Sequence, residues 1–154
     1  MSLSIVVPVY NESENINPFT DRVLLVLNKI SVKYEIIFVL DPSEDDTENK
    51  ILELVKKNPN IKLIKLSRRF GQPSAMLAGI KNSSMDNVVL IDVDLQDPPE
   101  LIEQMYEDRK EGYETILAKR SKKKGENIIK KIISDLGYFL IYKLSDTNIP
   151  RNVG

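Results

Sequence analysis

The chain has 154 residues and a formal net charge of -1, with 42% hydrophobic and 29% charged residues. This length suffices for one globular domain with a buried core, and a charge so close to zero excludes an overall electrostatic attraction to nucleic acid. Cysteine and histidine are both absent, which excludes disulfides, thiol nucleophiles and the commonest general base. Carboxylates and hard cations remain as the available chemistry.

Short β-branched runs alternate along the chain with longer segments of helical period, a pattern typical of βαβ units in a mainly parallel sheet. The alternation predicts strands at residues 4–9, 34–40, 62–66, 87–92 and 115–119, and helices at about 17–30, 47–57, 73–81 and 98–111. The first, second and fourth strands are nearly all apolar, as expected of strands covered on both faces. We therefore expect an α/β fold, a Rossmann-like three-layer sandwich with helices on both faces, built as a single domain over residues 1–154.

No part of the sequence has the features of a signal peptide or the length of a membrane span. The first apolar run, residues 5–9, is too short and lacks a basic lead, and no apolar stretch reaches the roughly 18 residues that a spanning helix needs. A basic cluster at 119–131 precedes an apolar segment at 137–142. This arrangement fits two alternatives equally: a helix on an anionic membrane surface, or an ordinary helix that packs its apolar side on the sheet.

Polar residues follow the predicted ends of four strands. Residues 10–12 follow the first strand, Asp41 the second, residues 67–69 the third and residues 92–96 the fourth. In a parallel sheet the carboxyl ends of the strands meet at one edge, where ligands bind, so we expect these residues to be neighbours. Two arginines and several acids at this edge predict a site for a metal–phosphate ligand, with carboxylates on the cation and guanidinium groups on the phosphate.

The segment VVLIDVDLQDPPELI at 88–102 places acidic residues directly on the end of an apolar strand. In an extended chain alternate side chains share a face, so Asp92, Asp94 and Gln96 are expected to project together and to suit Mg²⁺ or Mn²⁺. Neither G-x-G-x-x-G nor G-x-x-x-x-G-K-[ST] occurs in the sequence. Without a glycine-rich phosphate cradle, the pattern favours a nucleotide carried as its metal complex.

Four stretches, in chain order, carry a family resemblance: SIVVPVYNESENI at 4–16, EIIFVLDPSEDDT at 35–47, IKLIKLSRRFGQPSAMLAGI at 61–80 and VVLIDVDLQDPPELI at 88–102. Together they resemble the inverting nucleotide-sugar glycosyltransferases with the A-type fold (GT-A). A further stretch, LSDTNIPRNVG at 144–154, is similar to the bacterial branch that transfers a sugar to polyprenyl phosphate, akin to dolichyl-phosphate mannose synthases. The resemblance covers nearly the whole chain.

The resemblance implies roles for individual residues. It places Pro8, Tyr10 and Glu12 beside the nucleoside, and Val39 and Asp41 at the base. It places Asp92 and Val93 against the ribose and diphosphate, and Asp94 and Gln96 on the Mg²⁺ or Mn²⁺ ion. Arg68 and Arg120 are implied as phosphate or donor contacts.

The resemblance also implies a reaction, in which a polyprenyl phosphate oxygen attacks the anomeric carbon with inversion and the metal stabilises the leaving nucleoside diphosphate. A UDP-sugar is the favoured donor, and GDP-mannose is the alternative. After the second strand the chain has Leu40-Asp41-Pro42-Ser43 where the family has Asp-Asp-Gly-Ser. This departure leaves the nucleotide preference open.

In the family, a sequence such as PRNVG is followed by an aspartate that serves as catalytic base. The base is therefore expected beyond Gly154, and the catalytic residue is unknown within residues 1–154. We expect a soluble, truncated part of a protein that works at the cytoplasmic face of the cell membrane. Its expected partners are a nucleotide sugar, polyprenyl phosphate and, through further C-terminal segments, the membrane surface.

Three alternatives stay open. A nucleotidyltransferase that makes sugar nucleotides shares the sheet and the cation, but it places a glycine-rich basic loop after its first strand, where this chain has Tyr10-Asn11-Glu12. A phospho-acceptor signalling domain shares the acids at one edge of the sheet and a lysine, here Lys119, after the last strand. It needs an acidic pair after the first strand, and this chain has none there. A nucleotide-binding module without activity is possible because the catalytic base that the resemblance implies is expected beyond Gly154.

Overall fold

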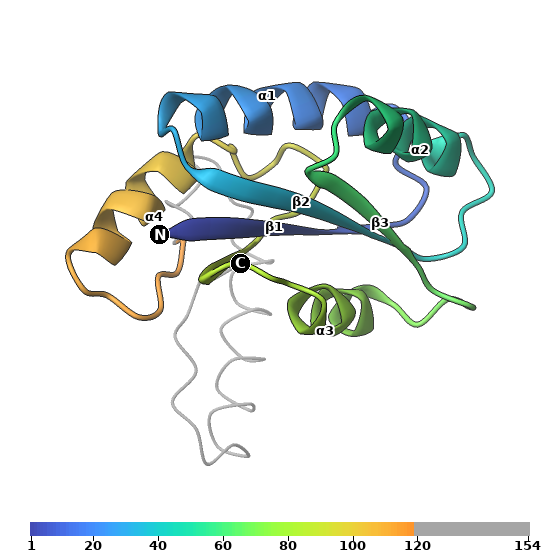
Figure 1. The fold of residues 1–154 in the computed structure, drawn as a ribbon. Helices are drawn as coiled ribbons and strands as arrows, with labels where there is room; N and C mark the ends of the chain where they lie inside the picture. The colour runs from blue at the N-terminus through green and yellow to red at the C-terminus, as the bar shows by residue number, and fades with distance from the viewer. Residues whose placement is uncertain (119–154) are drawn as a thin grey trace, which may run out of the picture. The chain divides into compact units, whose positions relative to one another are not determined.

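A computed structural model describes residues 1–118 of the chain. The chain forms two compact units, residues 1–110 and 111–154, and all helices and strands of the described part fall in the first unit (Figure 1). In chain order they are β1 (Ser2–Val9), α1 (Ile16–Lys29), β2 (Lys33–Leu40), α2 (Thr47–Lys57), β3 (Ile61–Lys65), α3 (Gln72–Lys81), β4 (Asn87–Leu90) and α4 (Leu101–Lys110). Among the described residues, no helix has both the length and the apolar character needed to cross a bilayer.

The four strands form one parallel sheet in the order β3-β2-β1-β4. β1 and β2 are the inner strands, and they pair along their whole length, from Ser2 opposite Lys33 to Val9 opposite Leu40. α1 and α2 cover one face of the sheet and α3 lies on the other (Figure 1). The expected parallel, three-layer α/β fold is therefore confirmed, and every strand directs its carboxyl end toward the same edge.

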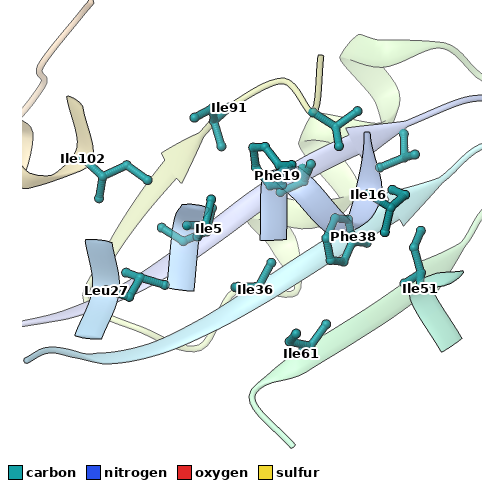
Figure 2. Packing of buried hydrophobic residues seen from close by; sticks show 14 of the residues in the cluster. Ile5, Ile16, Phe19, Leu27, Ile36, Phe38, Ile51, Ile61, Ile91 and Ile102 are labelled. Atoms are coloured by element: carbon teal, nitrogen blue, oxygen red, sulfur yellow. The ribbon is translucent and has the colours of Figure 1, made fainter. Parts of the chain in front are cut away.

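The inner strands are apolar on both faces because helices cover both. On one face Phe38 of β2 packs against Phe19 of α1, and the two rings meet edge to face with centroids 6.4 Å apart (Figure 2). On the other face Val6 and Val39 are buried in the cluster that packs against α3. The helix approaches so closely that a Cβ on Gly79 would lie 2.2 Å from Val6 Cγ1, so glycine is required there.

A buried carboxylate lies near the amino-terminal end of the sheet. Glu35 of β2 is 1% exposed. It accepts hydrogen bonds from Lys62 Nζ at 2.6 Å, Ser4 Oγ at 2.5 Å and the Ser84 backbone N at 2.6 Å. Burial by itself raises the pKa of Glu35, but the hydrogen bonds from Lys62, Ser4 and Ser84 outweigh it and lower the pKa to about 2. The ionised carboxylate thus ties β1, β2, β3 and the α3–β4 connection together.

The first seven elements lie within two residues of their expected bounds, and α4 shows the largest difference. α4 begins at Leu101 rather than at residue 98. The carbonyls of Pro98 and Pro99 accept hydrogen bonds from the backbone N of Leu101 and Ile102, at 3.1 and 3.0 Å. The two prolines therefore form a turn that leads into the helix instead of its first turn.

The strand expected at residues 115–119 is not present in the described part of the chain. Residues 115–118 form neither strand nor helix, and Lys119 lies outside the described residues. A short β-branched run becomes a strand only where a neighbouring strand pairs with it, so local propensity alone does not decide the outcome. The expected single domain over residues 1–154 stays a prediction.

Candidate active site

A pocket of about 310 Å³ lies at the carboxyl edge of the sheet. Its walls come from the ends of β1 and β2, the segment after β4 and the start of α3. The lining residues expected from the sequence are Pro8, Tyr10, Glu12, Asp41, Asp92, Val93 and Asp94, and the others are Val9, Arg69, Gly71, Gln72 and Ala75. The expected meeting of the strand ends is confirmed, whereas the binding role of each residue stays a prediction.

The other residues expected at the site do not line this pocket. The side chain of Val39 is completely buried in the cluster that packs against α3. The guanidinium carbon of Arg68 lies 4.7 Å from the centroid of the Phe70 ring. Gln96 is exposed to solvent, and Arg120 lies outside the described residues.

The acidic segment after β4 does not continue as an extended chain, contrary to expectation. β4 ends at Leu90, Leu95 has a φ of 60°, and Asp94 Oδ1 accepts a hydrogen bond from the Gln96 backbone N at 2.9 Å. An aspartate that bonds the backbone two residues onward makes a turn. The extended conformation expected over residues 92–96 is therefore wrong, and of the three residues expected to project together, Asp92 and Asp94 line the pocket.

Asp41, at the end of β2, is 3% exposed and holds the connection between β3 and α3. Its carboxylate oxygens accept hydrogen bonds from the backbone N of Phe70 at 3.1 Å and of Gly71 at 2.9 Å. Gly71 has a φ of 85°, a conformation that residues with a Cβ rarely adopt. A base contact by Asp41 stays a prediction, and it would share a carboxylate that already has two backbone partners.

Gln72 lines the pocket, although the sequence pattern did not predict it there. It is the first residue of α3, and its Nε2 donates a hydrogen bond to Asp92 Oδ1 at 2.7 Å. Its place shortly after the third strand was an available signal, because the residues that follow parallel strands converge at one edge. The position of Gln72 in the sequence could therefore have suggested that it lines the pocket. Its residue type could not, because glutamine is common at the start of a helix.

Of the two arginines expected at this edge, Arg69 lines the pocket, and Arg68, the one that the family resemblance implied, does not. The guanidinium carbon of Arg69 lies 3.9 Å from the centroid of the Tyr10 ring, and its Nη1 donates a hydrogen bond to the Tyr10 hydroxyl at 3.3 Å. A guanidinium over an aromatic face is attracted by the negative face of the ring. The sequence indicates that both arginines follow the third strand, but it gives no basis for choosing between adjacent loop residues.

The loops after β1 and β2 are tied to each other by side-chain hydrogen bonds. Asp45 accepts from the backbone N of Ser13 at 3.0 Å and of Thr47 at 3.1 Å, and also from the Thr47 hydroxyl. Desolvation raises the pKa of Asp45, but the bonds from Thr47 and Ser13 outweigh it and lower the pKa to about 2. The Thr47 hydroxyl in turn accepts from the Glu12 backbone N at 2.9 Å. The backbone at Glu12 is therefore held in place by the β2–α2 loop.

The oxygen ligands of the pocket suit a hard divalent cation. The carboxylates of Asp92 and Asp94 lie in its wall, and Mg²⁺ and Mn²⁺ prefer such ligands. In residues 1–118, no group of three or more His, Cys, Asp or Glu side chains forms a metal cluster by itself. Mg²⁺ is commonly held by one or two carboxylates together with substrate phosphates. The residues present thus fit a cation that shares its coordination with a phosphate ligand.

Curated relatives match the chain over its whole length. An uncharacterised glycosyltransferase of Bacillus subtilis, YkcC, is 42% identical over 98% of this chain and 47% of its own. The bactoprenol glucosyl transferase of Shigella phage SfV is 38% identical over 100% of this chain and 50% of its own. The chain therefore spans about half the length of the curated relatives it matches.

Solved glycosyltransferases share the fold. S. aureus TarS in complex with UDP superposes with a TM-score of 0.59 and 25% identity, over 82% of this chain and 38% of that one. Glucosyl-3-phosphoglycerate synthase from Mycobacterium tuberculosis, with Mn²⁺, UDP and phosphoglyceric acid, gives a TM-score of 0.64 and 22% identity, over 99% of this chain and 54% of that one. These likenesses confirm the GT-A type of fold. The model for glycosyl transferase family 2 matches residues 4–154, and the chain belongs to that family of transferases.

Proposed function

We propose that this chain binds the donor in an enzyme that transfers a sugar, with inversion, from a nucleoside diphosphate sugar to polyprenyl phosphate. The observation that carries the proposal is the pocket at the carboxyl edge of the sheet, which brings the carboxylates of Asp92 and Asp94 together with the guanidinium of Arg69. Family membership supports sugar transfer. The bactoprenol glucosyl transferase supports the lipid acceptor, and the UDP complex of TarS supports a uridine nucleotide.

The pocket offers different chemistry to the two ends of a nucleotide. One part of the wall is apolar and aromatic and suits the nucleoside; it consists of Pro8, Tyr10 and Val93. Asp92 accepts hydrogen bonds from the ribose hydroxyls, and the bond from Gln72 Nε2 keeps its carboxylate oriented. The donor is thereby held with its diphosphate toward the acidic turn that follows β4.

Asp94 would hold Mg²⁺ or Mn²⁺ together with the donor diphosphate. Positive charge at that place would stabilise the leaving diphosphate. Gln96 lies in the same turn as Asp94 and stays a predicted further ligand.

The acceptor is itself a phosphate. One of its oxygens attacks the anomeric carbon on the side opposite the diphosphate, so the new C–O bond forms as the bond to the diphosphate breaks, and the configuration inverts. A phosphate oxygen is already anionic at neutral pH, so little or no deprotonation is needed. Because the acceptor is a lipid, the enzyme works at the membrane surface, on the cytoplasmic side where nucleotide sugars are found.

Donor binding is tested by calorimetric titration of the 154-residue chain with UDP-glucose, UDP and GDP-mannose, with Mn²⁺ and with chelator. We expect Mn²⁺ to strengthen the binding of UDP-glucose by about ten-fold or more, as for a charge-assisted interaction. Asp94→Asn is expected to abolish this dependence on Mn²⁺. Asp21→Asn is the matched control, since Asp21 is exposed on α1 and does not line the pocket.

The possible results separate the parts of the proposal. Absence of nucleotide binding under every condition would contradict the donor site. An affinity that chelator leaves untouched would contradict the metal role of Asp94. The acceptor is tested with the full-length protein, radiolabelled UDP-glucose and polyprenyl phosphate in detergent, where a failure to form labelled lipid would contradict the transfer.

A further inference from the structure

We propose that Arg69, stacked on the Tyr10 ring, binds the diphosphate of the donor nucleotide in this pocket. The inference rests on the proposed function and assigns its diphosphate contact to one of the two arginines expected at this edge of the sheet. It depends on three observations: the free donors of the guanidinium, the anchoring of its loop, and the charge of the pocket.

The guanidinium of Arg69 has hydrogen-bond donors to spare. An arginine side chain carries five N–H donors in one plane. One of them, on Nη1, is directed to the Tyr10 hydroxyl oxygen at 3.3 Å. The guanidinium carbon lies 3.9 Å from the centroid of the Tyr10 ring, and this stacking uses the face of the guanidinium and not its edge. Among residues 1–118, none of the ion pairs found involves Arg69. An edge with unused N–H groups fits the paired oxygens of a phosphate.

The backbone next to Arg69 is anchored at the pocket. The following two residues, Phe70 and Gly71, donate their backbone N–H groups to the buried carboxylate of Asp41, at 3.1 and 2.9 Å. The Tyr10 ring supports the other end of the side chain. The guanidinium is therefore positioned before a ligand arrives, which lowers the entropy cost of binding.

The charge of the pocket requires a cation besides the metal. Glu12, Asp92 and Asp94 contribute carboxylates to the wall, and a nucleoside diphosphate adds further negative charge. One divalent ion cannot balance both sets of charges. Among residues 1–118, Arg69 is the basic side chain that lines this pocket, whereas the adjacent Arg68 lies over Phe70.

The test compares Arg69→Gln with Arg68→Gln, which removes the same charge from the neighbouring position. The dissociation constants of UDP and uridine are measured in Mn²⁺ by calorimetric competition on the 154-residue chain. Arg69→Gln is expected to raise the dissociation constant of UDP by about ten-fold or more, the usual range for a charge-assisted hydrogen bond. The dissociation constant of uridine is expected to stay within about two-fold of the parent value. Arg68→Gln is expected to leave both ligands within about two-fold. Arg69→Lys, which keeps the charge but loses the planar fork, is expected to fall between the parent and Arg69→Gln.

Each remaining outcome overturns the inference in a different way. If Arg69→Gln lowers the affinities for UDP and for uridine by the same factor, Arg69 only supports the ring of Tyr10. If Arg69→Gln and Arg68→Gln lower the affinity for UDP by the same factor, the effect is a general one of charge and not a contact of Arg69. Unchanged UDP affinity in Arg69→Gln, with normal binding by the parent, would overturn the role of Arg69 while the proposed function stands. A parent chain that binds no nucleotide would overturn both.

Discussion

Replacing Glu35 with glutamine is expected to destabilise the fold at neutral pH, and the loss is expected to shrink in acid. The carboxylate of Glu35 is 1% exposed and accepts hydrogen bonds from Lys62, Ser4 and Ser84. Glutamine keeps the shape of the side chain but removes the charge that these donors stabilise. It also replaces one acceptor oxygen by an NH₂ group, so at least one of the donors from Lys62, Ser4 and Ser84 loses its acceptor.

The magnitude follows from the pKa of Glu35, which is lowered from 4.5 to about 2 in the folded protein. At about 1.4 kcal/mol per pH unit, this difference is worth about 3 kcal/mol at neutral pH. The unfolded chain takes up the proton first, so this stability is complete above pH 4.5 and is lost as the pH falls from 4.5 toward 2. About 1.5 kcal/mol remains at about pH 3. The side chain of Lys62 is 50% exposed, and solvent therefore screens its interaction with Glu35. The two free energies are accordingly upper bounds.

The assay is urea unfolding followed by circular dichroism, at neutral pH and at about pH 3, for the parent, Glu35→Gln and Glu48→Gln. Glu48 is the matched control, because it pairs with Lys65 at 2.6 Å and its side chain is 38% exposed. An exposed pair of this kind is worth about 0–1 kcal/mol. The reasoning is refuted if the loss in Glu35→Gln is the same at both pH values, or if it is no larger than the loss in Glu48→Gln.

Two further predictions concern the sheet and the pocket loop. Gly79→Ala is expected to cost about 1–3 kcal/mol in the same urea assay, because the added Cβ would lie 2.2 Å from Val6 Cγ1, and a stability equal to that of the parent would contradict this close approach. Asp41→Asn is expected to speed hydrogen exchange at the backbone N–H of Phe70 or Gly71 by about ten-fold, because an NH₂ group replaces one acceptor oxygen. Unchanged exchange rates would show that other contacts hold the loop.

The sequence by itself determined the layered fold and the edge at which the pocket forms. The periodicity of the apolar residues is a local property, and it predicted the inner strands β1 and β2 and the helix α1 between them within two residues. Because the strands are parallel, their carboxyl ends lie at one edge of the sheet. This is why Tyr10, Asp41 and Asp92, which are far apart in the sequence, could be expected to meet.

Only the tertiary structure decided which side chains face the pocket. Arg68 and Arg69 are equivalent in the sequence, and the choice between them depends on the bonds that Asp41 makes to the following residues and on the ring of Tyr10. Likewise, Asp94 lines the pocket, whereas Gln96, two residues later in the same turn, does not. Loop residues have no repeating pattern that fixes their direction, so contacts between distant segments set it. The periodic elements were therefore predictable from local sequence, while the orientation of the residues that bind a ligand was not.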